Sequence, residues 1–147
     1  MKIGLVINPQ SGVGGSVALK GSDGAKLQEL AKRRDGEPRG VERAHAFLER
    51  LLLIIDDLTK EVSWKTWGDD MGETVLQSHQ VDFEVLGHPK SPTVGADTSE
   101  ACSVISGAGV DILIFVGGDG TARNVLEGIS PGTVSYTHLR AHETILD

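Results

Sequence analysis

One aspartate stands inside a glycine-rich string that is typical of phosphate binding. Residues 114–121 read Ile-Phe-Val-Gly-Gly-Asp-Gly-Thr, so an apolar strand-like run leads directly into Gly117-Gly118-Asp119-Gly120-Thr121. Glycines let a backbone approach phosphate without a Cβ in the way. Amide groups that open a following helix are unpaired and attract anions. Thr121 suits either a helix cap or a donor to phosphate.

A carboxylate within such a turn repels phosphate unless the chemistry requires it. Asp119 fits general-base help to an attacking hydroxyl, or an electrostatic link to magnesium. A tight turn with an aspartate cap is the alternative for a bare Gly-Asp-Gly. The full five-residue string, placed between a strand and a helix, favours the functional interpretation.

A second glycine-rich segment follows the first apolar run of the chain. Residues 2–7 lead into Asn8-Pro9, and the segment continues with Ser11-Gly12-Val13-Gly14-Gly15. It lacks the Gly-Lys-Ser/Thr of a Walker A loop and does not satisfy Gly-x-Gly-x-x-Gly. Asn8 fits a hydrogen bond to a ribose hydroxyl and an Asx turn equally well.

Apolar runs and amphipathic stretches alternate along the chain. The pattern predicts strands over 2–7, 61–66, 81–86 and 111–116, and helices over 25–34, 41–58, 72–80, 96–108 and 121–129. In the helix over 96–108, Ala101, Val104 and Ile105 are expected to face inward. This alternation predicts an α/β fold, an open parallel sheet with helices on both faces. Ligands of such sheets bind beyond the carboxyl ends of the strands, where both glycine-rich segments fall.

Composition narrows the class of protein. The 147 residues fit one domain, and a net charge of −7 argues against a nucleic-acid surface. No apolar run approaches the length of a membrane span, and the single Cys102 fits a reducing cytoplasm. We expect Trp64 and Trp67 to pack in the core or at its edge rather than to form a stacking platform, and Cys102 to be a buried small residue. His45, His79 and His88 show no metal-ligand spacing, so no metal site is expected from them.

The end of the chain has a different character. Residues 134–144 read Val-Ser-Tyr-Thr-His-Leu-Arg-Ala-His-Glu-Thr, which is one translation frame of a common transposase sequencing adapter. A genuine polar tail is the alternative. We interpret residues 1–133 as an N-terminal α/β nucleotide-binding domain of a longer protein, and residues 134–147 as a non-native tail.

The ordered motifs resemble the start of the ATP-NAD kinase family, which includes the AcoX-like proteins. The likeness covers about residues 1–130, and the order of the motifs is more specific than any one of them. The matching landmarks are Asn8-Pro9, Ser11-Gly12, Gly14-Gly15, residues 17–24, Glu37-Pro38, Glu42-Arg43-Ala44, Gly68, Met71-Gly72, Thr93, Asp97-Thr98 and Gly117 to Arg123.

The resemblance implies an N-terminal domain like that of phosphofructokinase, followed by a β-rich domain, with nucleotides in the cleft between them. The implied reaction moves the γ-phosphoryl group of ATP to the 2′-hydroxyl of NAD, giving NADP, with a divalent metal such as Mg²⁺. Asp119 would be catalytic, and the residues facing the nucleotides would be Asn8, Gly12, Gly14, Gly15, Gly117, Gly118, Gly120 and Thr121. We expect the full-length form to be a cytoplasmic homo-oligomer.

Two departures from the family pattern affect these expectations. Asn124 stands where relatives usually carry an aspartate, and the downstream Asn-Glu/Asp motif is absent, so the fragment itself should turn over poorly. Three alternatives stay open: an AcoX-like kinase with another substrate, a lipid kinase of the diacylglycerol type, and a non-catalytic nucleotide-binding fragment. The Lys20-Gly21-Ser22-Asp23-Gly24 segment favours the NAD branch over the lipid branch.

Overall fold

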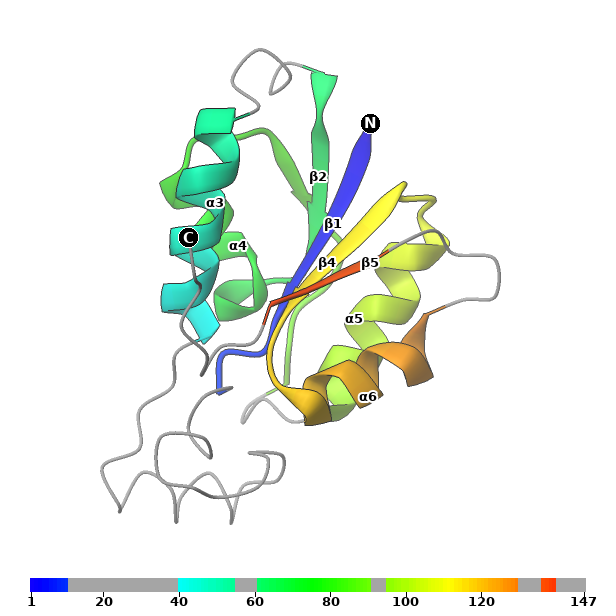
Figure 1. The fold of residues 1–147 in the computed structure, drawn as a ribbon. Coiled ribbons are helices and arrows are strands. Elements are labelled where there is room, and N and C mark those ends of the chain that lie inside the picture. The colour runs from blue at the N-terminus through cyan, green and yellow to red at the C-terminus, as the bar shows by residue number, and fades with distance from the viewer. Residues whose placement is uncertain (11–39, 55–60, 91–94, 130–135, 140–147) are drawn as a thin grey trace, which may run out of the picture.

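A computed structural model describes residues 1–10, 40–54, 61–90, 95–129 and 136–139, the last range by its backbone alone. Within these ranges five parallel strands form one sheet in the order β3-β2-β1-β4-β5. Helices α3 and α4 cover one face, and α5 and α6 cover the other (Figure 1). The expected open parallel α/β sheet is therefore confirmed.

The elements lie close to their predicted positions. The strands are β1 (Lys2–Ile7), β2 (Ser63–Thr66), β3 (Phe83–Val85), β4 (Ile112–Val116) and β5 (Tyr136–Leu139). The helices are α3 (Gly40–Ile54), the short 3-10 helix η2 (Asp69–Met71), α4 (Glu73–Ser78), α5 (Gly95–Gly107) and α6 (Asp119–Gly128). The helix predicted over 25–34 lies outside the described residues.

The two central strands, β1 and β4, are the most deeply buried. They pair in register from Ile3 with Ile112 to Ile7 with Val116. Their near-continuous apolar sequences are what a strand covered by helices on both faces requires. Burial of Val116 and Ile7, the last residues of the two strands, places both strand exits against the core.

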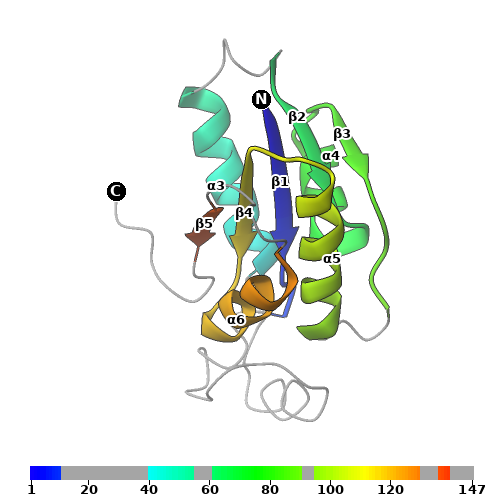
Figure 2. The same ribbon diagram turned by 90° about the vertical axis from the view of Figure 1, so that its right-hand side faces the viewer.

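Alternate residues of these strands serve two separate cores. Leu5 and Ile114 pack with the α3 and α4 side, whereas Val6 and Phe115 pack with the α5 and α6 side. This alternation follows from the two-residue period of a strand. The two faces can be distinguished in Figure 2, where α5 and α6 lie in front of the sheet.

Three details differ from the prediction. Helix α6 begins at Asp119 rather than at Thr121, because Gly118 takes the N-cap position and Ala122 N donates to Gly118 O at 3.0 Å. Val104, which the helical pattern placed inward, is 41% exposed, whereas Ala101 and Ile105 are buried as predicted. Strand β5 falls within residues 134–147, whose non-native origin stays a prediction.

Candidate functional site

The site lies where the order of the strands changes direction. The chain proceeds outward from β1 to β2 and β3, and then adds β4 on the other side of β1. The exits of β1 and β4 are thus neighbours, and Asn8 N donates to Val116 O at 2.9 Å. A crevice at such a switch point is the usual ligand position in open α/β sheets.

A buried side-chain hydrogen bond joins the two exits. Asn8 Nδ2 donates to Thr121 Oγ1 at 2.9 Å, and the two residues are only 8% and 2% exposed. Asn8 Oδ1 also accepts a hydrogen bond from Gln10 N at 3.1 Å, which confirms the Asx turn. Both polar ends of the Asn8 amide therefore have protein partners. The hydrogen bond from Asn8 to a ribose hydroxyl stays a prediction.

Gly117 allows Thr121 to fold back against the turn. A Cβ added at Gly117 would lie 2.2 Å from Thr121 Oγ1 and 2.4 Å from its Cβ. Glycine is therefore required at this close approach, rather than for an unusual backbone angle. Thr121 is not the helix cap, because that position belongs to Gly118 and no side chain caps α6.

Asp119 is the first residue of α6 and is exposed at the carboxyl edge of the sheet. The amide groups of Gly120 and Thr121 precede the first helical hydrogen bond, which Ala122 makes. Such amides, together with the helix dipole, bind anions. The turn therefore combines donors for a phosphate with a carboxylate that can accept a proton or contact a cation.

The turn provides one carboxylate of the kind that binds magnesium together with phosphate oxygens. Mg²⁺ in such sites is held by one or two carboxylates together with phosphate oxygens. Asp119 supplies one exposed carboxylate beside the anion-binding amides.

Asp97, at the start of α5, has a structural contact instead. It is 3% exposed and accepts a hydrogen bond from Lys90 N at 3.1 Å, so it anchors the segment after β3.

The predicted site residues fall into two groups. The structure brings Asn8 together with the turn that carries Gly117, Gly118, Asp119, Gly120 and Thr121. Gly12, Gly14 and Gly15 lie in residues 11–39, outside the described part, and their predicted role stays a prediction.

Asn124, the residue that departs from the family pattern, lies on α6 against the start of α5. Its Nδ2 is buried without a hydrogen-bond partner, and it lies 2.6 Å from the place of a Cβ at Gly95, where α5 begins. Its backbone oxygen accepts a hydrogen bond from Ser99 Oγ at 3.0 Å. The residue therefore packs between α5 and α6 and touches the first residue of α5.

Several side chains away from the turn have plain structural environments. Trp64 and Trp67 are 2% and 3% exposed, which confirms core packing over a stacking platform. Cys102 is buried as predicted, and burial raises the pKa of its thiol to about 12, so it stays a protonated, unreactive thiol. His45 Nδ1 and His79 Nε2 lie 3.2 Å apart, joining α3 to the end of α4.

Sequence spacing missed one grouping. Asp69, Glu73 and His88 each offer a ligand atom, and these atoms lie within 4.8 Å of one another. The three residues come from η2, α4 and the segment after β3. Only the parallel pairing of β2 with β3 brings them together, so no local motif could have revealed them.

Comparison with models of protein families identifies the chain more specifically. Residues 3–134 match the model described as the ATP-NAD kinase N-terminal domain. No curated protein and no solved structure gave a significant match. Within the described residues, no helix is long and apolar enough to cross a membrane. The family match spans most of the chain and includes both strand exits of the site, and the chain belongs to the ATP-NAD kinase family through this N-terminal domain.

Proposed function

We propose that this chain supplies the N-terminal domain of a kinase that transfers the γ-phosphoryl group of ATP to the 2′-hydroxyl of NAD. Family membership supports the reaction class. The observation that carries the proposal is the buried Asn8–Thr121 hydrogen bond, which fixes the Gly117–Asp119 turn against the exit of β1. A turn held in this way keeps its carboxylate and amides in place for a substrate.

Each part of the turn has a defined task in this reaction. The amides that open α6 bind phosphate oxygens, and Gly117 and Gly118 let the nucleotide approach the backbone. Asp119 accepts the proton of the 2′-hydroxyl as its oxygen attacks the γ-phosphorus. The bond from the γ-phosphorus to its bridging oxygen then breaks, and ADP leaves. Mg²⁺ on the phosphates would neutralise developing charge when bound.

The proposal includes the rest of the assembly. Small-molecule nucleotides are the ligands, a second domain closes the cleft, and the complete protein acts as a cytoplasmic homo-oligomer. The acceptor is NAD rather than a lipid, since residues 20–24 resemble the NAD branch. An AcoX-like protein with another acceptor would share the turn and differ in product.

The test measures NADP formed from ATP and NAD by the complete protein. Asp119→Asn should lower kcat by about 100-fold or more, the range of a lost general base. Asp82→Asn is the matched control, because Asp82 is exposed just before β3 and should leave the rate unchanged. Absence of NADP from the wild type, or full activity of Asp119→Asn, would refute the proposal.

A further inference from the structure

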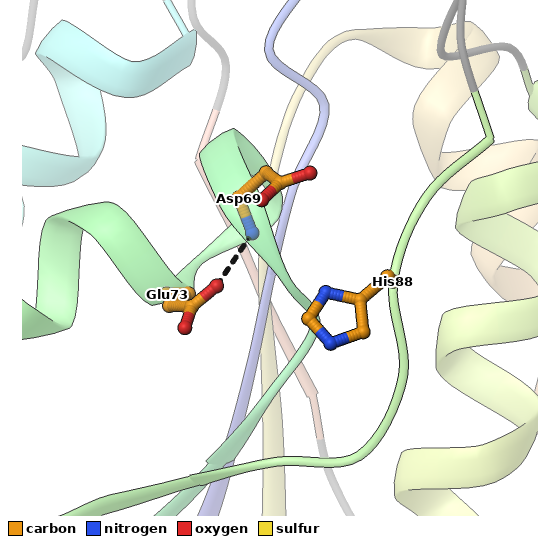
Figure 3. A group of neighbouring side chains, drawn as sticks. All are labelled: Asp69, Glu73 and His88. Atoms are coloured by element: carbon orange, nitrogen blue, oxygen red, sulfur yellow. Dashed lines mark hydrogen bonds between the residues drawn. The ribbon is translucent and has the colours of Figure 1, made fainter.

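Three side chains of types that can bind a metal ion, Asp69, Glu73 and His88, lie close together at the exits of β2 and β3 (Figure 3). Asp69 begins η2, Glu73 begins α4, and His88 lies on the segment that leaves β3. Their ligand atoms are all within 4.8 Å of one another. Asp69 and His88 are exposed and Glu73 is half-buried, so an ion can reach them from solvent.

Within the described part of the chain, no positive side chain balances the charge of this cluster. Among the described residues, no lysine or arginine pairs with Asp69 or Glu73, whereas Lys65 pairs with Glu84 nearby on β2 and β3. Glu73 Oε1 accepts a hydrogen bond from Asp69 N at 2.9 Å, which orients one carboxylate toward the other residue. Two carboxylates this close repel each other, and a cation between them removes that repulsion.

The imidazole distinguishes this cluster from an ordinary acidic patch. A Cβ added at Gly68 would lie 2.2 Å from His88 Nδ1 and 2.9 Å from two ring carbons. The ring therefore occupies a place that only glycine leaves open. Gly68 N also donates to Gly87 O at 2.7 Å, which ties the segment carrying Asp69 to the one carrying His88.

We propose that Asp69, Glu73 and His88 bind a divalent transition-metal ion of the Zn²⁺ type. Imidazole nitrogen with carboxylate oxygens suits Zn²⁺ and its neighbours, whereas Mg²⁺ prefers oxygen ligands alone. Three protein ligands leave at least one position for water or for a second molecule. None of residues 117–121 takes part, so the site stands whether or not the chain belongs to an active kinase.

The first measurement is calorimetric titration of the metal-free chain with Zn²⁺, with Mg²⁺ in excess as a competitor. We expect a saturable binding event that Mg²⁺ does not displace. Absorption of the Co²⁺-loaded protein should show the visible bands of a site with a nitrogen ligand. If Zn²⁺ gives no saturable binding, or if excess Mg²⁺ displaces it, the proposal fails.

Single substitutions then assign the binding to these residues. His88→Ala, Asp69→Asn and Glu73→Gln should each weaken Zn²⁺ binding at least about tenfold, the lower limit for changes even to outer partners of a metal site. Asp70→Asn is the matched control, because Asp70 is the exposed neighbour of Asp69 and lies outside the cluster. Equal weakening by Asp70→Asn would indicate general attraction to acidic residues and would overturn the site.

Folding of these variants can be checked independently. The substituted residues are exposed or half-buried, so the free energy of unfolding should change by no more than about 0.5 kcal/mol. A variant that keeps the wild-type circular dichroism and still binds Zn²⁺ with wild-type affinity would remove its residue from the site. Retained affinity in His88→Ala would refute the proposal as a whole.

Discussion

Two neighbouring regions on the carboxyl edge of the sheet differ in how deeply their polar side chains are buried. At the exits of β1 and β4, Asn8 and Thr121 are almost fully buried and hydrogen-bonded to each other. At the exits of β2 and β3, Asp69 and His88 are both exposed. Both regions lie at the carboxyl ends of parallel strands, where ligands of such sheets usually bind. From this difference in burial we expect the first region to be rigid, whereas the exposed side chains of the second region can change position.

The same contrast appears in how each region uses glycine. Gly117 leaves room for Thr121, a side chain that is 2% exposed and held by Asn8. Gly68 leaves room for the ring of His88, which is exposed. An added methyl group meets an immovable neighbour in the first case and a movable one in the second. The two glycines should therefore respond differently to alanine.

The largest expected effect is that of Gly117→Ala. The new Cβ would meet Thr121 at 2.2 Å, and the hydrogen bond from Asn8 prevents Thr121 from turning away. Overpacking of this kind costs about 1–3 kcal/mol in the free energy of unfolding. Urea denaturation followed by circular dichroism measures the change.

Gly107→Ala is the control for this substitution. Gly107 ends α5, and apart from its chain neighbours and the backbone of its own helix no atom lies within 4 Å of the position of an added Cβ. Alanine should leave stability unchanged or raise it by up to about 1 kcal/mol, the difference in helix propensity. If Gly117→Ala unfolds at the same urea concentration as the wild type, the exits of β1 and β4 are less rigid than the contacts indicate.

A smaller effect is expected at the far end of α4, the helix that begins with Glu73. Burial lowers the pKa of His79 from 6.5, the charge of His45 lowers it further, and Glu49 opposes the shift. The unfolded chain therefore binds this proton more readily, and stability falls as pH drops below about 6.5. The difference in unfolding free energy between the wild type and His79→Gln should decrease between about pH 7 and pH 5.

Zn²⁺ binding at neutral pH provides the control for that experiment. His79 lies at the opposite end of α4 from Glu73, so His79→Gln should leave the affinity unchanged. A pH dependence that is identical in the wild type and the variant would show that the His45–His79 contact is not linked to stability.

Sequence alone predicts the first region far better than the second. The string Gly117 to Thr121 follows a buried strand directly, so its location on the sheet edge follows from local pattern. The partner of Thr121 was harder to predict, because Asn8 is distant in sequence and the two meet only when β1 pairs with β4. Helical periodicity also misplaced Val104, since it cannot distinguish the buried stripe from its margin.

The second region had no local signal at all. Asp69, Glu73 and His88 follow no metal-ligand spacing, and their meeting depends on the parallel register of Trp64 with Phe83. Long-range strand pairing of this kind is what a single sequence leaves undetermined.

The smallest expected change in stability is that of Gly68→Ala, which tests the comparison most sharply. Gly68 has φ −66° and ψ 166°, an extended conformation that alanine also adopts, so the backbone is not strained. The methyl group would displace the exposed ring of His88. We expect unfolding to change by no more than about 0.5 kcal/mol, and Zn²⁺ affinity to fall at least about tenfold.

The double variant Gly68→Ala with His88→Ala separates the two causes of such a loss. Without the ring there is nothing for the methyl group to displace, so Gly68→Ala should add no further loss of Zn²⁺ affinity. An additive loss would mean that Gly68 acts through the backbone that carries Asp69. A loss of stability as large as that of Gly117→Ala would mean that the ring of His88 is as immovable as Thr121, and the contrast between the regions would disappear.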